Sequence, residues 1–274
     1  MLAEFYEQYE TLRRDFNAKK GNYIFKWDKY DAKLIGGGKN NDTRLRLDLL
    51  PQPFVGDIEN ASVIICSLNP GFEENDVEVE NPANPKNHAD DILNQLSKSA
   101  PKSMFWLTEK EKPLFPGTEK EKPLFSGGAK YWQGKFNQKN PNESFVKAVI
   151  RGYCDNGIKK SEDDVFKLLS EKIALIELFP YHSARFDRKY LKCKSTEKIR
   201  EYVCNTLIKN AAENDQLICF ARSYKEWTRG MNVAESGNVI RNLSVQNITF
   251  NVKKDFGRKI FEHIKNHTDN FTKP

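Results

Sequence analysis

The sequence lacks the cysteine and histidine patterns that bind metals. Its five cysteines form no Cys-x-x-Cys pair, and it contains four histidines. Metal-ligand and iron–sulfur spacings are therefore absent, and we expect neither a metal nor an organic cofactor. An odd number of cysteines behind a polar first segment, MLAEFYEQYETLRRDF, is typical of a reducing compartment rather than of a secreted protein. We therefore expect a cytoplasmic protein.

Long apolar runs and a strong excess of one charge are also missing. No run approaches the length that crosses a bilayer, so we expect no membrane partner. Lys and Arg total 44 against 38 acidic residues, a formal net charge of +6. This excess fits ordinary solubility and also attraction to a polyanion such as nucleic acid, and charge alone does not decide between them. The glycine-rich residues 33–41 match neither GxGxxG nor GxxxxGKS and predict a flexible turn.

Apolar runs of strand length alternate with helical patterns along the chain. Residues 61–68 (ASVIICSL) are rich in β-branched side chains, which predicts a buried parallel strand. The other runs of this kind are residues 173–178, 216–220 and 247–252, and the helical patterns are residues 2–16, 144–153, 163–171, 195–213 and 254–266. This alternation predicts an α/β fold, a three-layer α/β/α sandwich around a central, mostly parallel, four-stranded sheet.

The length of 274 residues suits one domain of this class, which buries its core without disulfides. We therefore expect a single domain over residues 1–274, with a helical segment at its start and an inserted loop near residues 101–135. That loop contains the octapeptide TEKEKPLF twice, at residues 108–115 and 118–125. The repeat indicates a local duplication in a tolerant surface segment.

Two polar segments directly follow predicted strands. In an open parallel sheet, ligands bind beyond the carboxyl ends of the strands. Residues 69–72 (NPGF) follow the strand predicted at 61–68, and residues 179–182 (FPYH) follow the strand predicted at 173–178. The rule therefore places these two segments near one another, at one edge of the sheet.

The first of these segments belongs to a longer motif. Residues 53–72 (PFVGDIENASVIICSLNPGF) resemble the first motif of the uracil-DNA glycosylase superfamily, in the Asn-Pro-Gly version of mismatch-specific and single-strand-selective glycosylases. The resemblance implies that Asn69 holds the attacking water. It also implies that the turn through Pro70 and Gly71 approaches the sugar and base closely, and that Phe72 lines the base pocket. The alternative is a plain turn after a strand, but the core strand and the upstream Val-Gly-Asp favour the functional interpretation.

The second segment, residues 173–183 (IALIELFPYHS), is similar to the strand that reads the pyrimidine edge in the single-strand-selective branch. An Asn ends that strand, whereas here Glu177 stands in its place, followed by Phe179 and Tyr181 as further candidate substrate-binding residues. An amide donates and accepts hydrogen bonds, but a carboxylate only accepts, which suits the exocyclic amine of cytosine or adenine. Two alternatives stay open: Glu177 points away into a salt bridge, or a dry pocket keeps it protonated and able to donate to a carbonyl.

The third motif of the superfamily, His-Pro-Ser-Pro or close to it, is missing. The His of that motif stabilises the departing base anion. The corresponding residues 241–250 contain no His, although Asn242, Ser244 and Gln246 could donate hydrogen bonds to DNA instead. His182, beside the predicted site, is the candidate catalytic replacement, with a structural capping role as the default alternative.

Three basic residues are candidates for contacts with DNA. Arg222 follows the strand predicted at 216–220, where it could touch phosphate or base. Lys253 and Lys254 stand at the start of the last predicted helix, where phosphates bind readily. A solvated helix face is the alternative for the two lysines.

Together these residues predict a monofunctional DNA glycosylase that hydrolyses the N-glycosidic bond of a flipped, modified or damaged base. Glu177 favours a modified cytosine over plain uracil. Members of this superfamily that attack hypermodified cytosines in bacteriophage DNA imply an anti-phage defence role. The alternatives are a uracil or mismatch repair glycosylase, a non-catalytic nucleic-acid-binding protein on the same fold, and a hydrolase of free nucleotides. We expect DNA as the partner of a monomeric protein.

Overall fold

A computed structural model describes the greater part of the chain. The described residues are 2–31, 43–72, 77, 92–93, 104, 127–231, 233, 236–243 and 248–268. The glycine-rich residues 33–41, both copies of TEKEKPLF, Ser244 and Gln246 lie outside them. Within the described ranges, no helix is long and apolar enough to span a membrane.

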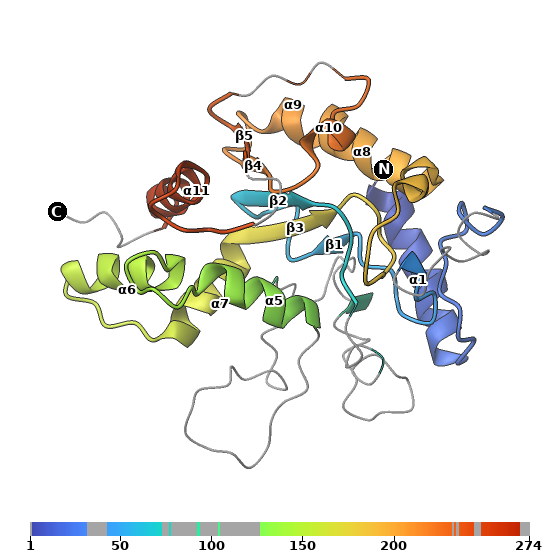
Figure 1. Cartoon of the computed structure of the whole chain (residues 1–274), viewed down its shortest axis with the longest axis horizontal. Helices are drawn as coiled ribbons and strands as arrows, with labels where there is room; N and C mark the ends of the chain where they lie inside the picture. The colour runs from blue at the N-terminus through green and yellow to red at the C-terminus, as the bar shows by residue number, and fades with distance from the viewer. Residues whose placement is uncertain are drawn as a thin grey trace, which may run out of the picture.

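A five-stranded, mostly parallel sheet lies at the centre of the fold (Figure 1). Its strands are β1 (Phe54–Val55), β2 (Val63–Ser67), β3 (Ile173–Glu177), β4 (Leu217–Phe220) and β5 (Val239–Arg241), in the order β1-β3-β2-β4-β5. Strands β2 to β5 run parallel, and β1 pairs antiparallel with β3 at one edge. The predicted α/β class with a mostly parallel sheet is confirmed, with five strands in place of four.

Helices cover both faces of the sheet, as a three-layer sandwich requires (Figure 1). One side carries α5 (Gly127–Phe136), α6 (Phe145–Asp155) and α7 (Glu162–Lys172), and the other carries α8 (Lys194–Tyr202), a π-helical turn (Val203–Leu207), α9 (Ile208–Asn210) and α10 (Tyr224–Trp227). Helix α11 (Asp255–Asn266) packs beside α6 and β2, α1 (Leu2–Asn17) flanks β1, and a 3₁₀ helix spans Arg188–Lys192. Because both faces are covered, every residue of β2, β3 and β4 is buried, which explains their apolar sequences.

The prediction of a strand at residues 247–252 is wrong. Its described residues, 248–252, form no strand, and the fourth parallel strand is β5 instead. The apolar alternation has another cause, since Ile248 and Phe250 are buried and the ring of Phe250 stacks on Phe136 of α5, with 4.1 Å between centroids. Strands β1 and β5, with two and three residues, are too short to leave a periodic pattern.

The inserted loop predicted near 101–135 is wrong for residues 127–135, which belong to α5. Glycines at the start of this helix lower its intrinsic propensity and hide it from pattern analysis. Packing supplies the stability instead, because Trp132 and Phe136 are buried against Phe250. All five predicted helices are confirmed within a few residues, as α1, α6, α7, the α8–α9 segment and α11.

The close approach of β1 to β3 requires glycine at position 56. Gly56 has a φ of +88°, and a Cβ there would lie 2.9 Å from the carbonyl oxygen of Ile173. A larger residue would be strained both by the dihedral angle and by this contact. The chain then enters a turn at Asp57, whose carboxylate accepts hydrogen bonds from the N–H groups of Glu59 and Asn60. The Val-Gly-Asp segment therefore fixes the entry to β2.

Candidate active site

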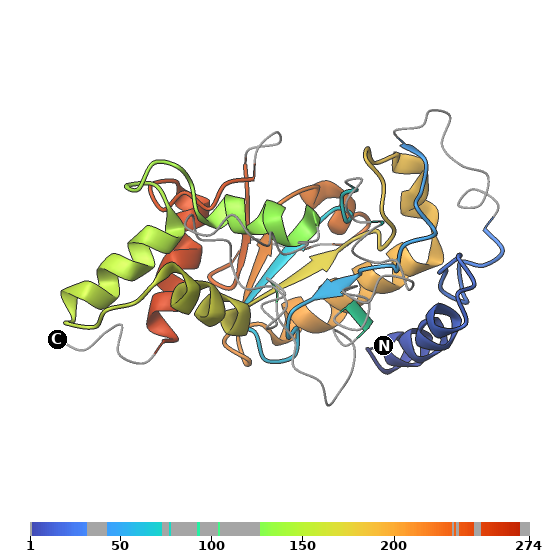
Figure 2. The ribbon, with the colours of Figure 1, turned by 90° about the horizontal axis from the view of Figure 1, so that it is seen from below.

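The carboxyl ends of β2, β3 and β4 lie at the same edge of the sheet (Figure 2). Ser67, the last residue of β2, pairs with Glu177, the last residue of β3. The N–H of Ala221, just past β4, donates to the carbonyl oxygen of Cys66 at 2.9 Å. This edge therefore gathers the segments that follow three neighbouring strands, which is where open α/β sheets bind ligands.

Asn69 lies just past β2, half-buried, with its amide held in place. Its Nδ2 donates to the carbonyl oxygen of Pro70 at 2.8 Å and to Oγ of Ser183 at 3.1 Å. A backbone carbonyl only accepts, so the contact with Pro70 settles which end of the amide is nitrogen. Among the described residues, no hydrogen bond engages Oδ1 of Asn69. That oxygen is therefore available to accept a hydrogen bond from a water molecule.

His182 holds the Asn-Pro-Gly turn. It is buried, and its Nδ1 lies 2.8 Å from the carbonyl oxygen of Gly71. Because this oxygen only accepts, Nδ1 carries the proton. The carbonyl of His182 in turn accepts from the N–H of Arg46 at 3.0 Å. Residues 69–72 and 179–182 therefore meet as expected, and this geometry supports the structural role of His182 over the catalytic one.

Arg46 is a residue of this edge that the sequence did not reveal. Its guanidinium lies 4.3 Å from the centroid of the Phe72 ring, and its Nε donates to Oδ1 of Asp48 at 2.8 Å. The hydrogen bond with Arg46 outweighs partial burial and lowers the pKa of Asp48. A cation therefore covers one face of the ring that was expected to line the base pocket. The local sequence RLRLD carries no sign of this contact, because Phe72 is distant along the chain.

Glu177 is buried at the end of β3, with 3 % of its surface exposed. Its Oε2 has no hydrogen-bond partner among the described residues, and within the same residues Glu177 forms no ion pair. Burial raises the pKa of Glu177 to about 8, against the opposing effects of a hydrogen bond with Ser67 and of the charge of Arg222. At neutral pH this side chain is therefore mostly a neutral acid, with one donor and one acceptor.

Arg222 and Tyr131 meet beside Glu177. Nη2 of Arg222 donates to the hydroxyl oxygen of Tyr131 at 3.2 Å. Burial raises the pKa of Tyr131, which Arg222 lowers and Glu177 raises further, so the three groups lie within electrostatic reach of one another. Lys135, also on α5, lies 4.7 Å from the centroid of the Tyr131 ring. Sequence reasoning missed Tyr131 and Lys135 as site residues because it did not predict α5.

The backbone bends sharply directly after Arg222. Ser223 adopts a left-handed conformation, with φ 55° and ψ 38°, which is strained for a residue other than glycine. The bend leads from β4 into α10, where Nε1 of Trp227 donates to the carbonyl oxygen of Ser67 at 2.9 Å. This contact ties α10 to the end of β2 and keeps Arg222 at the carboxyl edge.

Phe179 and Tyr181 lie in the core rather than at a surface. The ring of Phe179 is fully buried and stacks on Tyr190, with 5.1 Å between centroids. The hydroxyl of Tyr181 donates to Oδ2 of Asp28 at 2.8 Å, and Oδ1 of Asp28 accepts from the N–H of Ser195 in the first turn of α8 at 3.1 Å. The structure therefore places these two predicted substrate-binding rings in the core, where Phe179 packs on Tyr190 and Tyr181 binds Asp28.

Asn242, Lys253 and Lys254 are the predicted DNA contacts that the structure describes besides Arg222. The N–H of Asn242, directly after β5, donates to the carbonyl oxygen of Phe220 at 2.9 Å, which fixes Asn242 at this edge. Its neighbour Leu243 is 80 % exposed, and Lys253 and Lys254 are exposed just before α11.

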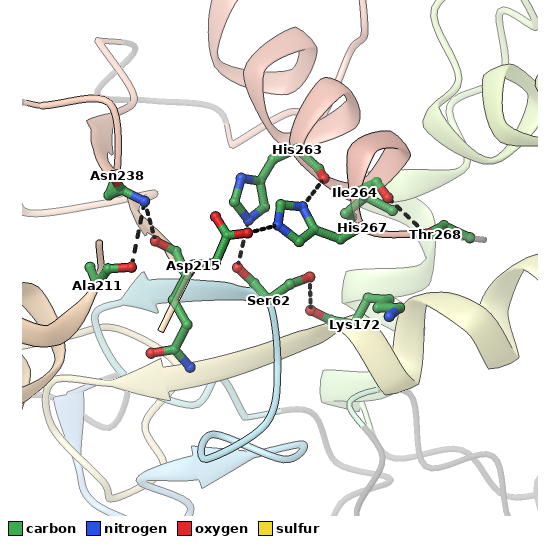
Figure 3. A network of polar contacts seen from close by, with 10 residues as sticks. Ser62, Lys172, Ala211, Asp215, Asn238, His263, Ile264, His267 and Thr268 are labelled. Carbon is green, nitrogen blue, oxygen red and sulfur yellow. Dashed lines mark hydrogen bonds and ion pairs between the residues drawn. The ribbon is translucent and has the colours of Figure 1, made fainter. Parts of the chain in front are cut away.

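The far end of α11 lies at the opposite, amino edge of the sheet (Figure 3). There Nε2 of His263 contacts the carbonyl oxygen of Ser62, just before β2, at 3.1 Å, and Nε2 of His267 contacts Oδ2 of Asp215, just before β4, at 2.5 Å. The end of helix α11 is therefore anchored at the amino edge, and Lys253 and Lys254 lie just before its start. In the described part of the chain, no three His, Cys, Asp or Glu side chains gather in a way that could hold a metal ion.

Comparisons of the chain with protein-family models, with curated proteins and with solved structures found no match. The fold and the site define an α/β protein with a polar site at the carboxyl edge of its sheet. The likeness of residues 53–72 to a glycosylase motif stays a resemblance, so the function is inferred from the geometry of the site.

Proposed function

We propose that this chain is a DNA glycosylase, which hydrolyses the bond between a base and its deoxyribose. The observation that carries this proposal is the fixed amide of Asn69. Its two donor bonds, to Pro70 and Ser183, leave Oδ1 as the acceptor for a proton of water. An amide is too weak a base to deprotonate water, so it acts by orienting the water for attack.

The reaction needs a flipped nucleotide, a water on the far face of the sugar, and dipoles that stabilise developing charge. As the bond between C1′ and the base nitrogen breaks, its electron pair leaves with the base and positive charge develops on the sugar. The water oriented by Asn69 bonds to C1′, and the proton that it loses ends on the base. The products are an abasic site and a free base.

The Asn-Pro-Gly turn supports a close contact with the substrate. Gly71 is exposed, and a Cβ at this position would meet no atom of the described residues within 4 Å. The fold itself therefore does not require glycine here. The open space in front of this backbone suits the approach of a nucleotide, and His182 keeps the turn in place through the carbonyl of Gly71.

Glu177 is the group that we propose to select the base. As a neutral acid it offers one donor and one acceptor, like an amide, and suits a base with a carbonyl at its edge. As a carboxylate it only accepts and suits the exocyclic amine of a cytosine derivative. The protonation state of Glu177 therefore decides between the two classes of pyrimidine. Ionised Glu177 suits a modified cytosine of phage DNA, and with it a role in defence.

Exposed side chains suit the binding of DNA whose bases must be unstacked before one of them is flipped. Leu243 presents a large apolar side chain at the end of β5, and apolar side chains inserted between base steps unstack DNA. Lys253 and Lys254 present positive charge just before α11, which suits phosphates.

The proposal is tested by base release from duplex and single-stranded oligonucleotides that carry uracil, mismatched thymine, cytosine or 5-hydroxymethylcytosine at one position. Strand scission after alkali marks an abasic site, and mass spectrometry of the supernatant identifies the base. Scission supports the proposal. Binding of DNA without scission contradicts it in favour of a non-catalytic binding protein, and activity on free nucleosides alone contradicts it in favour of a small-molecule hydrolase.

A further inference from the structure

Arg222 carries a charge that the described part of the protein leaves uncompensated. Its Nη2 donates to the hydroxyl of Tyr131 at 3.2 Å, which is a neutral acceptor. Its Nε is buried and has no hydrogen-bond partner among the described residues, and within them Arg222 forms no ion pair. Leaving a buried N–H of a charged group unsatisfied costs stability. The arrangement therefore calls for an acceptor that a ligand would bring.

Glu177 stands across the end of β2 from Arg222 and does not cancel this charge. Burial raises the pKa of Glu177 to about 8, although Ser67 and Arg222 oppose the shift, so most of the carboxyl groups are neutral at pH 7. Tyr131 is neutral too, because the ordinary pKa of a phenol lies well above 7 and burial raises that of Tyr131 further. Lys135 lies within electrostatic reach of Arg222, because that charge, after burial, lowers the pKa of Lys135. The site therefore has a net positive potential at its buried end.

Two of the three described histidines lie far from the ends of β2 and β4, and the third is engaged by the turn that follows β2. His182 donates through Nδ1 to the carbonyl of Gly71, and His263 and His267 lie at the amino edge of the sheet. Arg222 is held where β2 and β4 end, beside the segment that carries Asn69. A negative charge that develops at this edge would therefore meet the guanidinium of Arg222.

We propose that Arg222 is a catalytic residue whose guanidinium stabilises the negative charge on the departing base. This inference rests on the proposed glycosylase reaction. When the bond from C1′ to the base nitrogen breaks, its electron pair stays with the base and spreads onto the carbonyl oxygen. The donors of Arg222 hydrogen-bond this oxygen while the water bonds to C1′ and its proton passes to the base. Prepositioned donors of this kind stabilise a transition state because they need no reorganisation.

A phosphate is the other acceptor that an arginine at this edge could bind, and the two roles differ in what they predict. A phosphate contact changes the affinity for every DNA to the same extent. A contact with the departing base matters most when that base is a poor leaving group. Fluorine at C5 withdraws electrons from a pyrimidine, so a 5-fluoro base leaves more easily and needs Arg222 less.

The experiment measures single-turnover base release by the full chain from duplex oligonucleotides. The substrates are two pairs: deoxyuridine with 5-fluorodeoxyuridine, and deoxycytidine with 5-fluorodeoxycytidine. The variants are Arg222→Gln and Arg222→Lys, and the matched control is Arg229→Gln, which removes an exposed arginine after α10. Thermal unfolding and near-ultraviolet circular dichroism establish that each variant is folded.

We expect Arg222→Gln to slow release of the unsubstituted base by about 100-fold or more, as for loss of a transition-state donor. Release of the 5-fluoro partner should slow much less, and the enzyme concentration that gives half of the maximal rate should stay near the wild-type value. Arg222→Lys, which keeps the charge, should recover part of the rate. Arg229→Gln should match the wild type for both members of each pair.

Equal slowing of both members of a pair, or a wild-type rate in Arg222→Gln, overturns this inference while the proposed function stands. If Arg222→Gln does not fold, Arg222→Lys is compared on the same two pairs of substrates. Equal slowing of the unsubstituted base and of its 5-fluoro partner in Arg222→Lys then overturns the inference. A wild-type enzyme that releases none of the four bases overturns the proposed function for these pyrimidines, and this inference with it.

Discussion

Glu177 differs from an ordinary glutamate because its carboxyl group is buried and forms no ion pair among the described residues. The hydrogen bond with Ser67 and the charge of Arg222 both lower its pKa, yet burial outweighs them. Tyr131 on α5 and Cys66 on β2 also lie close enough to sense its charge. The acid is therefore neutral below about pH 8 and ionised above it. This proton content could not be predicted from the motif IELFP, because it depends on burial and on two groups from other segments, Ser67 and Arg222.

The first prediction concerns the pH dependence of base release. We expect the rate of uracil release from duplex DNA to fall as pH rises through about 8. Ionised Glu177 repels a carbonyl oxygen of the base and neutralises the positive charge of Arg222. Glu177→Gln keeps a neutral donor and acceptor, so its rate should stay level over the same range. Glu171→Gln, on the exposed face of α7, is the control and should keep the wild-type profile. A wild-type rate that is indifferent to pH would show that Glu177 lies outside the reaction.

At the scale of elements, two glycines of the same motif have opposite reasons to be glycine. Gly56 is required by the fold, because of its positive φ and its closeness to the backbone of Ile173. Gly71 is not, because a Cβ there would meet none of the residues that the structure describes. We therefore expect Gly71→Ala to unfold at the wild-type temperature but to release base much more slowly. We expect Gly56→Ala to lower the stability by roughly 1 kcal/mol or more. Wild-type activity in Gly71→Ala would place the substrate elsewhere.

The sequence predicted those elements whose pattern is long and periodic. Strands β2, β3 and β4 are continuous apolar runs, and parallel pairing brought Asn69 and Glu177 to one edge as expected. Strand β5 was not predicted because it is three residues long, and helix α5 was not predicted because it begins with two glycines. The contacts of Tyr131 and of Arg46 were not predicted either, because each contact joins segments that are distant along the chain. Local pattern therefore locates the edge of the sheet but not the side chains that complete it.

At the scale of the whole molecule, the two edges of the sheet differ. The amino edge is closed by contacts between the end of α11 and the residues before β2 and β4, as Figure 3 shows. The carboxyl edge carries the half-buried amide of Asn69, the buried Glu177 and the exposed Leu243. A polymeric substrate is therefore expected to lie across the carboxyl edge.

Binding of DNA should depend on salt. Phosphate contacts release counterions, so the logarithm of the binding constant should fall linearly with the logarithm of salt concentration. Replacing Lys253 and Lys254 together by alanine should weaken binding to every sequence and reduce the slope by about 0.9 for each lost contact. Lys209→Ala, which removes an exposed lysine on α9 before β4, is the control and should change neither quantity. Affinity that does not respond to salt would argue against a nucleic-acid substrate.

The central claim is that Asn69 orients the water that releases a base from DNA. The most direct measurement is alkali-dependent strand scission, under single-turnover conditions, by the wild type, Asn69→Ala and the control Asn210→Ala at the exposed end of α9. Loss of a positioning group predicts a rate lower by roughly 100-fold or more in Asn69→Ala, with unfolding and DNA affinity unchanged and Asn210→Ala equal to the wild type. Undiminished scission by Asn69→Ala would contradict the account.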